Sequence, residues 1–230
     1  MKKAWWKILA ILLVGYTITA GLLADVPRLP ILNETVRVLL FHVPMWFGMI
    51  ALFTVSTVYS IKHLMNPLVK HDTYAIEFAN TGMLFGILGI LSGSLWARFT
   101  WGAFWTNDPK LNGAAIAMLI YAAYFILRGS FSDEQQRSRI SAIYNIFAYS
   151  TLIPLLFILP RMTDSLHPGN GGNPGFNIYD AASQLRSIFY PAVIGWTLMG
   201  LWLTSLRIRL NLVKQKMNEY EEENMLRTHN

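Results

Sequence analysis

The stretch FANTGMLFGILGILSGSLW, residues 78–96, decides what kind of fold this sequence can adopt. It contains no Asp, Glu, Lys or Arg, and as a helix rising about 1.5 Å per residue it can cross the roughly 30 Å hydrocarbon core of a bilayer. Its glycines share one helix face, because Gly82, Gly86, Gly89 and Gly93 are spaced by four, three and four residues. Such stripes of small residues let helix backbones approach closely, so the stretch predicts a membrane-spanning helix packed tightly against a neighbour.

Five more apolar stretches of similar length indicate a polytopic membrane protein. They are Ile8–Ala24, Val38–Ile61, Leu111–Leu127, Ile140–Leu159 and Ile188–Leu206. The 230 residues are 53% hydrophobic and 14% charged, whereas soluble domains carry about 25% charged residues. Backbone groups in lipid find no external partners, so we predict an all-α fold with six transmembrane helices, forming one membrane domain over residues 1–230. The basic start at Lys2, Lys3 and Lys7 leaves a cleaved signal peptide as the alternative for the first span.

The distribution of Lys and Arg predicts the orientation of these spans. With an even number of spans both termini lie on one side, which then carries 13 of the 19 Lys and Arg residues, against 6 on the other. The richer side is cytoplasmic under the positive-inside rule. We therefore expect cytoplasmic termini, a cytoplasmic tail at 207–230, and outer-face loops at 96–111 and 160–187. The net charge of +6 then reflects topology, since no loop has the long basic run typical of nucleic-acid binding.

The first of these outer loops contains WGAFWTND, residues 101–108, a dense group of aromatic rings. It holds Trp101, Phe104 and Trp105, and Trp96 lies five residues before Trp101. One interpretation is an aromatic belt, because Trp favours the membrane interface. Belt residues are scattered at one depth, whereas these rings are concentrated in one loop, which favours a flat binding surface.

Two histidines fall on the same predicted face. His42 lies in LLFHVPMW, at the outer start of the second span, where an ionisable group is a candidate functional residue. Trp46 follows four residues later and shares its helix face. The alternative for His42 is a structural hydrogen bond to a backbone carbonyl. His167 lies in the second outer loop, which is rich in Gly and Pro. Of the remaining histidines, His229 is expected to be solvated, and His63 and His71 are expected to be solvated or to face lipid headgroups.

Two imidazoles and several flat rings on one surface suggest a flat, apolar, metal-containing ligand. Haem fits this description, because imidazole nitrogens are common axial ligands of its iron and aromatic rings stack on its macrocycle. Its propionates require cations, and four of the six basic residues on the predicted outer side lie in the loops at 96–111 and 160–187. These are Arg98, Lys110, Arg161 and Arg186.

Three motifs at these positions resemble a known family. FHVP at 41–44, W-G-x-x-W-x-x-D-x-K-L at 101–111 and S-L-H at 165–167 are similar to the six-span CcmC-type haem-handling proteins of bacterial cytochrome c maturation. These proteins belong to the tryptophan-rich (WWD) haem-handling superfamily. The resemblance covers about residues 38–209. It implies that haem b is held non-covalently at the outer face of the inner membrane, with His42 and His167 as the axial ligands of the iron.

The resemblance also implies a role and a set of partners. Haem would be exported and passed to a periplasmic haem chaperone, which supplies apocytochrome c. ABC transporter subunits and a small membrane subunit of the maturation system would be further partners, and the chain itself would not be an enzyme. The residues expected to bind haem besides the two histidines are Trp46, Trp96, Arg98, Trp101, Phe104, Trp105, Asp108 and Lys110.

Four positions depart from the pattern of this family, which usually reads WGxWWxWD. Phe104 and Asn107 replace tryptophans. Lys110 stands where arginine is common, and Asn112 where threonine is common. Phe still stacks, and Lys still offers a positive charge, although without the planar fork of Arg. Asn107 replaces a ring by an amide, so we expect it to weaken the aromatic platform or to alter how the chaperone docks.

Residues and motifs that the sequence lacks narrow the range of possible functions further. The chain has no cysteine, so it cannot attach haem as a c-type cytochrome does and cannot exchange disulfides. It has no phosphate-binding loop, so ATP hydrolysis would belong to a partner. Two alternatives remain open. One is a membrane b-type cytochrome that carries electrons, which would normally bury histidine pairs between its spans. The other is a non-haem transporter subunit or scaffold.

Overall fold

The computed structural model describes residues 4–26, 32–167 and 183–228, and these are almost entirely helical. No strand occurs within those ranges. The long helices are α1 (Trp5–Leu23), α2 (Leu39–Met65), α3 (Val69–Trp101), α4 (Pro109–Gly129), α5 (Glu134–Ile153) and α6 (Ser183–Thr228). Six helical segments are long and apolar enough to cross a membrane. This confirms the predicted all-α, polytopic architecture.

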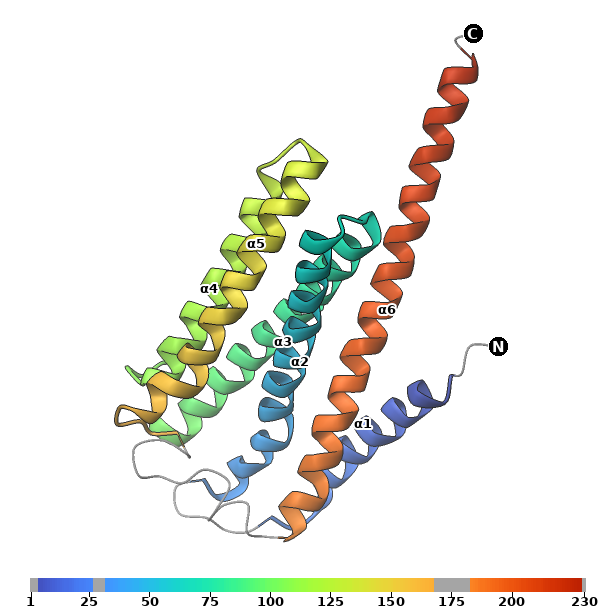
Figure 1. Cartoon of the computed structure of the whole chain (residues 1–230). Coiled ribbons are helices and arrows are strands. Elements are labelled where there is room, and N and C mark those ends of the chain that lie inside the picture. Colours follow the sequence, from blue (N-terminus) through green and yellow to red (C-terminus); the bar gives the residue numbers. More distant parts are fainter. Residues whose placement is uncertain (1–3, 27–31, 168–182, 229–230) are drawn as a thin grey trace.

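Helix α2 lies at the centre of the bundle (Figure 1). It packs against α3, α5 and α6. The α4–α5 hairpin covers one side of this central group, and α1 packs against α6 on the other. A 3₁₀ turn, η1 (Asn33–Val38), leads into α2. Chain segments that carry the predicted site therefore meet at one end of the bundle, where α2 begins and α3 ends.

The glycine stripe of α3 faces α2, as the sequence predicts. A Cβ added at Gly82 would lie 2.7 Å from the ring of Phe53, and one at Gly89 would lie 2.8 Å from Cε2 of Trp46. At Gly93 the added atom would lie 2.5 Å from Cε1 of His42. The stripe therefore does more than bring two backbones together, because its last two glycines make room for two residues of the candidate site.

The tryptophan-rich loop predicted at 96–111 is shorter than expected. Helix α3 continues through Trp101 and ends at Gly102, whose φ of 81° is in the left-handed region that glycine adopts without strain. Helix α4 begins at Pro109, after Asp108 accepts hydrogen bonds from the backbone N–H groups of Lys110 and Leu111. A carboxylate N-cap followed by proline at the first helical position is a common helix start. Only 102–108 connects the two helices.

The end of α5 changes its helical pattern at Pro154. Proline has no N–H to donate and its ring clashes with the preceding turn. The chain continues as a π-helical turn, η2 (Pro154–Ile158), and a 3₁₀ turn, η3 (Leu159–Arg161). Within η2 the carbonyl of Leu155 contacts the position where Gly113 of α4 would carry a Cβ. This close approach places residues 162–167 over the start of α4. Residues 168–182 of the predicted loop lie outside the described residues.

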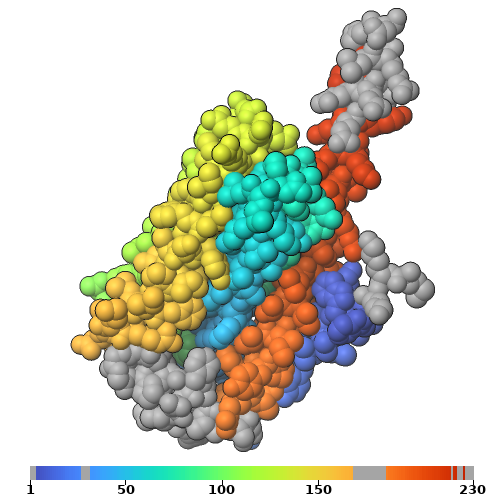
Figure 2. All heavy atoms as spheres, in the orientation of Figure 1, coloured from blue at the N-terminus to red at the C-terminus, as the bar shows by residue number. Residues whose placement is uncertain are grey.

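Helix α6 continues beyond the rest of the bundle (Figures 1 and 2). The predicted tail at 207–230 is its direct extension, helical as far as Thr228. Arg207 donates to Glu77 of α3 over 2.6 Å, and Asn211 donates to the same carboxylate over 3.1 Å. At the opposite end of α6, a small apolar cluster joins it to η1 and α2. That cluster consists of Val36, Leu40, Leu185, Ile188 and Phe189.

Candidate functional site

His42 lies in the first turn of α2, between two tryptophans. Its ring contacts Trp46 edge-on, with centroids 6.2 Å apart, and Trp96 edge-on at 5.9 Å. The indole N–H of Trp96 donates to the Thr35 hydroxyl of η1 over 3.1 Å. Since Trp96 belongs to α3, these contacts tie the start of α2, the end of α3 and η1 together around one half-buried imidazole.

Hydrogen bonds fix the tautomer of His42. The Ser92 hydroxyl donates to the Leu88 carbonyl over 2.7 Å, so its oxygen accepts the Nδ1–H of His42 at 3.0 Å. The indole N–H of Trp46 donates to Nε2 over 3.3 Å, consistent with a lone pair on that nitrogen. The sequence left a bond to a backbone carbonyl as the alternative for His42. The backbone of Gly89 does hydrogen-bond to the imidazole, beside the side chains of Ser92 and Trp46.

His167 is held by the carboxylate of Asp108. Nδ1 of His167 lies 2.9 Å from Oδ1 of Asp108. The Ser165 hydroxyl and the Leu166 N–H each donate to Oδ2 over 2.8 Å, and Asp108 is only 2% exposed. Asp108 therefore has two functions: it caps α4, and it holds the segment that carries His167. Trp101 packs edge-on against the imidazole with centroids 4.9 Å apart.

The protonation states of this pair follow from their surroundings. Burial alone would raise the pKa of Asp108, but hydrogen bonds from His167 and Ser165, the charge of His167 and the Leu166 N–H outweigh it and hold the pKa well below its usual range. Burial lowers the pKa of His167 below 6.5; the bond to Asp108 opposes this, and the charge of Lys110 adds to it. Around neutral pH, Asp108 is thus ionised and His167 is a neutral imidazole that donates from Nδ1.

The two histidines are connected through the last turns of α3. His42 contacts Trp96 and His167 contacts Trp101, and five residues of helix separate these tryptophans by roughly 7.5 Å along the axis. The structure thus brings four predicted residues from three separate segments to one end of the bundle.

Two further rings of the predicted platform are exposed. Phe104 is 58% exposed and Trp105 is 42% exposed. The guanidinium of Arg98 lies 5.9 Å from the centroid of Phe104 and also bonds the carbonyl of Gly102. Trp105 donates from its indole nitrogen to Asn112 over 3.2 Å. Trp105 is thus held at its edge through the indole N–H, and Arg98 lies over the ring of Phe104, while both side chains stay exposed.

Asn107 and Asn112, two of the four departures from the family pattern, are bonded to each other. The Asn112 amide donates to Oδ1 of Asn107 over 2.8 Å, while its own oxygen accepts from Trp105. The amide at Asn107 therefore supports the Trp105 ring through Asn112, which is a role the sequence alone did not suggest.

The basic residues predicted to pair with the haem propionates are less closely connected to the two histidines. Lys110 is partly buried near His167, whose pKa its charge lowers. Arg161 is exposed and donates to the carbonyl of Phe157 over 2.7 Å, and Arg186 is exposed in the first turns of α6. Sequence reasoning missed Thr35 and Ser92, and it included Ser165 only as part of the S-L-H motif. Ser92 stands next to Gly93 in an apolar span, and this polar residue beside the stripe was the available signal.

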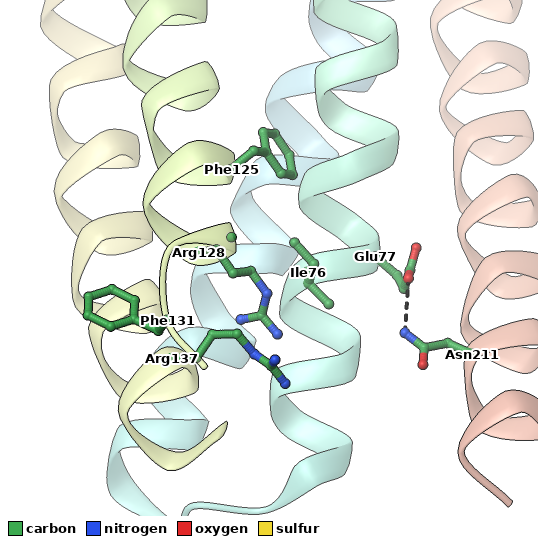
Figure 3. A pocket seen from close by; sticks show the side chains of 8 residues that line it. Ile76, Glu77, Phe125, Arg128, Phe131, Arg137 and Asn211 are labelled. Atoms are coloured by element: carbon green, nitrogen blue, oxygen red, sulfur yellow. Dashed lines mark hydrogen bonds between the residues drawn. The ribbon is translucent and has the colours of Figure 1, made fainter. Parts of the chain in front are cut away.

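A separate cavity of about 380 Å³ lies at the opposite end of the bundle (Figure 3). It is lined by Ile76, Glu77, Phe125, Arg128, Gly129, Phe131, Arg137 and Asn211. Figure 3 shows the hydrogen bond from Asn211 to Glu77 at its edge. It contains no imidazole and none of the predicted haem-binding residues. Across the described ranges, no group of three or more His, Cys, Asp or Glu side chains could hold a metal ion by itself.

Comparison with known families agrees with this geometry. The family profile described as CcmC, Heme exporter protein C, matches residues 1–223. The chain belongs to the CcmC family. Two of the relatives named Heme exporter protein C illustrate the similarity. The one from Haemophilus influenzae is 23% identical over 214 residues, covering 91% of this chain and 84% of the relative. The one from Bradyrhizobium diazoefficiens is 31% identical over 139 residues, covering 59% and 51%.

A third relative has a different name. Cytochrome c biogenesis protein CcsA of Pelargonium hortorum is 36% identical over 92 residues, which cover 40% of this chain and 29% of CcsA. Together these matches support a role for this CcmC-family chain in haem handling for cytochrome c maturation, as a transport or carrier component. The six helices and the family both make it a multi-pass membrane protein.

Proposed function

We propose that this chain binds haem b non-covalently as cargo, with His42 and His167 as axial ligands, and presents it for cytochrome c maturation. The observation that carries the proposal is the hydrogen bonding of the two imidazoles. Each donates from Nδ1, to Ser92 and to Asp108, which puts the lone pair on Nε2. A metal-binding histidine is commonly oriented in this way, through a bond from its other nitrogen to a carboxylate or other oxygen acceptor.

The aromatic residues would support the macrocycle. Trp96 and Trp101 contact the two imidazoles, and Phe104 and Trp105 present exposed rings on the segment between α3 and α4. Aromatic rings stack on flat conjugated systems in offset arrangements. Arg98 and Lys110 are the cations best placed to pair with propionates, because Arg98 adjoins Phe104 and Lys110 adjoins His167.

The orientation and partners follow from the same proposal. The excess of Lys and Arg on the side of both termini favours a site on the periplasmic side of the inner membrane. Haem bound there is accessible to a periplasmic haem chaperone, to which it would be passed. ABC transporter subunits and a small membrane subunit would complete the system and supply any ATP hydrolysis, for which this sequence has no motif.

Two other functions are less consistent with the site. An electron-carrying b-type cytochrome would bury its histidines within the spans, whereas His42 begins α2 and His167 follows η3. A simple aromatic belt would direct indole N–H groups to lipid headgroups. Trp46, Trp96 and Trp105 instead donate to His42, Thr35 and Asn112.

Haem titration of the purified chain in detergent tests the proposal. The wild type should develop a low-spin Soret spectrum, and His42→Ala and His167→Ala should each lose it. His71→Ala is the matched control, because His71 lies at the far end of the bundle and bonds the carbonyl of Asn66. In cells, both site variants should block holocytochrome c formation at normal protein levels. A double variant that still matures cytochromes would refute the axial-ligand assignment.

A further inference from the structure

Trp46 occupies the nitrogen of His42 that would bind iron. Its indole N–H points at Nε2 over 3.3 Å, and Ser92 already accepts from Nδ1. An imidazole nitrogen has one lone pair in the ring plane, which serves either a hydrogen bond or a metal. In the structure of the chain alone, both ring nitrogens of His42 therefore have protein partners.

We propose that Trp46 is a built-in competitor for the haem iron at His42, and thereby lowers the affinity of this ligand. The inference rests on the proposed function, since it requires His42 to coordinate haem. When haem binds, the N–H of Trp46 must leave Nε2. When haem departs, the N–H returns to it. Trp46 thus stabilises the haem-free ring and facilitates release, which suits a protein that gives up its cargo.

The packing of α2 and α3 keeps this competitor in place. Trp46 follows His42 by four residues on the same helix, so one helical turn brings the two side chains together. Gly89 of α3 leaves the space that the indole fills, since a Cβ there would lie 2.8 Å from Cε2 of Trp46. The hydrogen bond is longer than the common 2.9–3.0 Å for N–H donors, so it is weak enough for iron to displace.

The two proposed ligands are consequently unequal. His167 donates to a buried carboxylate, Asp108, which increases the electron density on its imidazole. His42 donates to the neutral hydroxyl of Ser92, and its Nε2 also accepts from Trp46. The weaker coordination is thus expected at His42.

The Trp46→Phe variant separates competition from stacking, because it keeps an aromatic ring and removes the N–H. We expect the dissociation constant for ferric haem, measured by Soret titration of the full chain, to fall about three- to tenfold, the equivalent of one net hydrogen bond. A role in stacking alone predicts unchanged or weaker binding. Trp202→Phe is the control: the same change on α6, where Trp202 lies beside Lys7, away from the site. In a His42→Ala background, Trp46→Phe should have no effect.

A second measurement needs no haem and no change at Trp46. Among the eight tryptophans, His42→Ala should remove the protection from hydrogen exchange of one indole N–H in ¹⁵N NMR, while the N–H of Trp96, bonded to Thr35, keeps its protection. The inference is overturned if no indole loses protection, or if a folded Trp46→Phe variant binds haem no more tightly than wild type. If His42→Ala binds haem as tightly as wild type, the proposed function itself is refuted. If His42→Ala weakens binding but Trp46→Phe does not tighten it, only the role of Trp46 is refuted.

Discussion

Replacing Asp108 by Asn tests whether its carboxylate orients His167. Oδ1 accepts from His167 and caps α4, and Oδ2 accepts from Ser165 and Leu166. An amide has one oxygen and one donating nitrogen. If the oxygen stays with His167 and the cap, the nitrogen faces the part-buried N–H of Leu166, and a donor left unsatisfied costs up to about 1–3 kcal/mol. If the amide turns, His167 must accept at Nδ1, which moves its lone pair away from Nε2.

Both arrangements weaken the site. The first preserves the cap of α4, because Asn caps helices about as well as Asp. The turned amide also loses the cap, because its nitrogen then faces the N–H groups of Lys110 and Leu111. Including the lost charge-assisted bond to His167, we expect a loss of about 2–3 kcal/mol, or roughly a 30- to 150-fold weaker haem affinity. Soret titration of purified protein measures it, with circular dichroism to verify helix content. Asp164→Asn is the matched control, since Asp164 is a nearby exposed carboxylate. An Asp108→Asn variant that binds within threefold of wild type, with the same low-spin spectrum, would refute the reasoning.

Three further predictions concern the same end of the bundle. The pKa of His167 lies below 6.5, so its imidazole stays mainly neutral at that pH. Haem affinity at pH 6.5 should therefore match that at pH 7.5, and should fall only once the pH drops below the lowered pKa. Loss of half of the haem affinity at pH 6.5 or above would contradict this. Gly93→Ala should reduce thermal stability, with a cost of about 1–3 kcal/mol for overpacking, and disturb the low-spin spectrum, whereas Gly15→Ala, which has open space around its Cβ, should do neither. Asn107→Ala and Asn112→Ala should each alter the fluorescence of the neighbouring indole, and a double variant equal to the sum of the two would show that the amides act independently.

The span positions could be predicted from the sequence, but the helix ends could not. Apolar length located all six helices because lipid requires it. The third span was predicted to begin at Phe78, where the charges end, yet α3 begins at Val69. Ion pairs explain the difference. Asp72 accepts two bonds from Arg128 over 2.8 and 2.5 Å, and Glu77 accepts from Arg207. The partners come from distant helices, so no local pattern could show that these charges are neutralised.

The residues of the candidate site could be proposed from the sequence, but their hydrogen-bond partners could not. The positive-inside count and the motifs brought His42, His167 and the tryptophans to one face without any knowledge of packing. Their hydrogen-bond partners are set by tertiary structure, because Ser92 is 50 residues from His42 and Thr35 is 61 residues from Trp96. Local patterns carry no information about contacts at such separations. The hydrogen bond between Asn107 and Asn112 was missed as well. Each residue was interpreted as a separate departure from the family pattern, so nothing suggested that the two are bonded to each other.

Helix α6 joins the two ends of the bundle as one continuous helix. The Glu77–Arg207 ion pair holds it near its middle, with about 36 Å of helix on the Ser183 side and about 32 Å on the Thr228 side. The half on the Ser183 side packs against α1, α2 and α3, so the projecting tail continues directly from a helix that is held within the bundle. That end packs on Val36 of η1, next to Thr35, which holds Trp96 beside His42. A protein that binds the tail would thus contact the same helix whose other end packs beside the residues around His42.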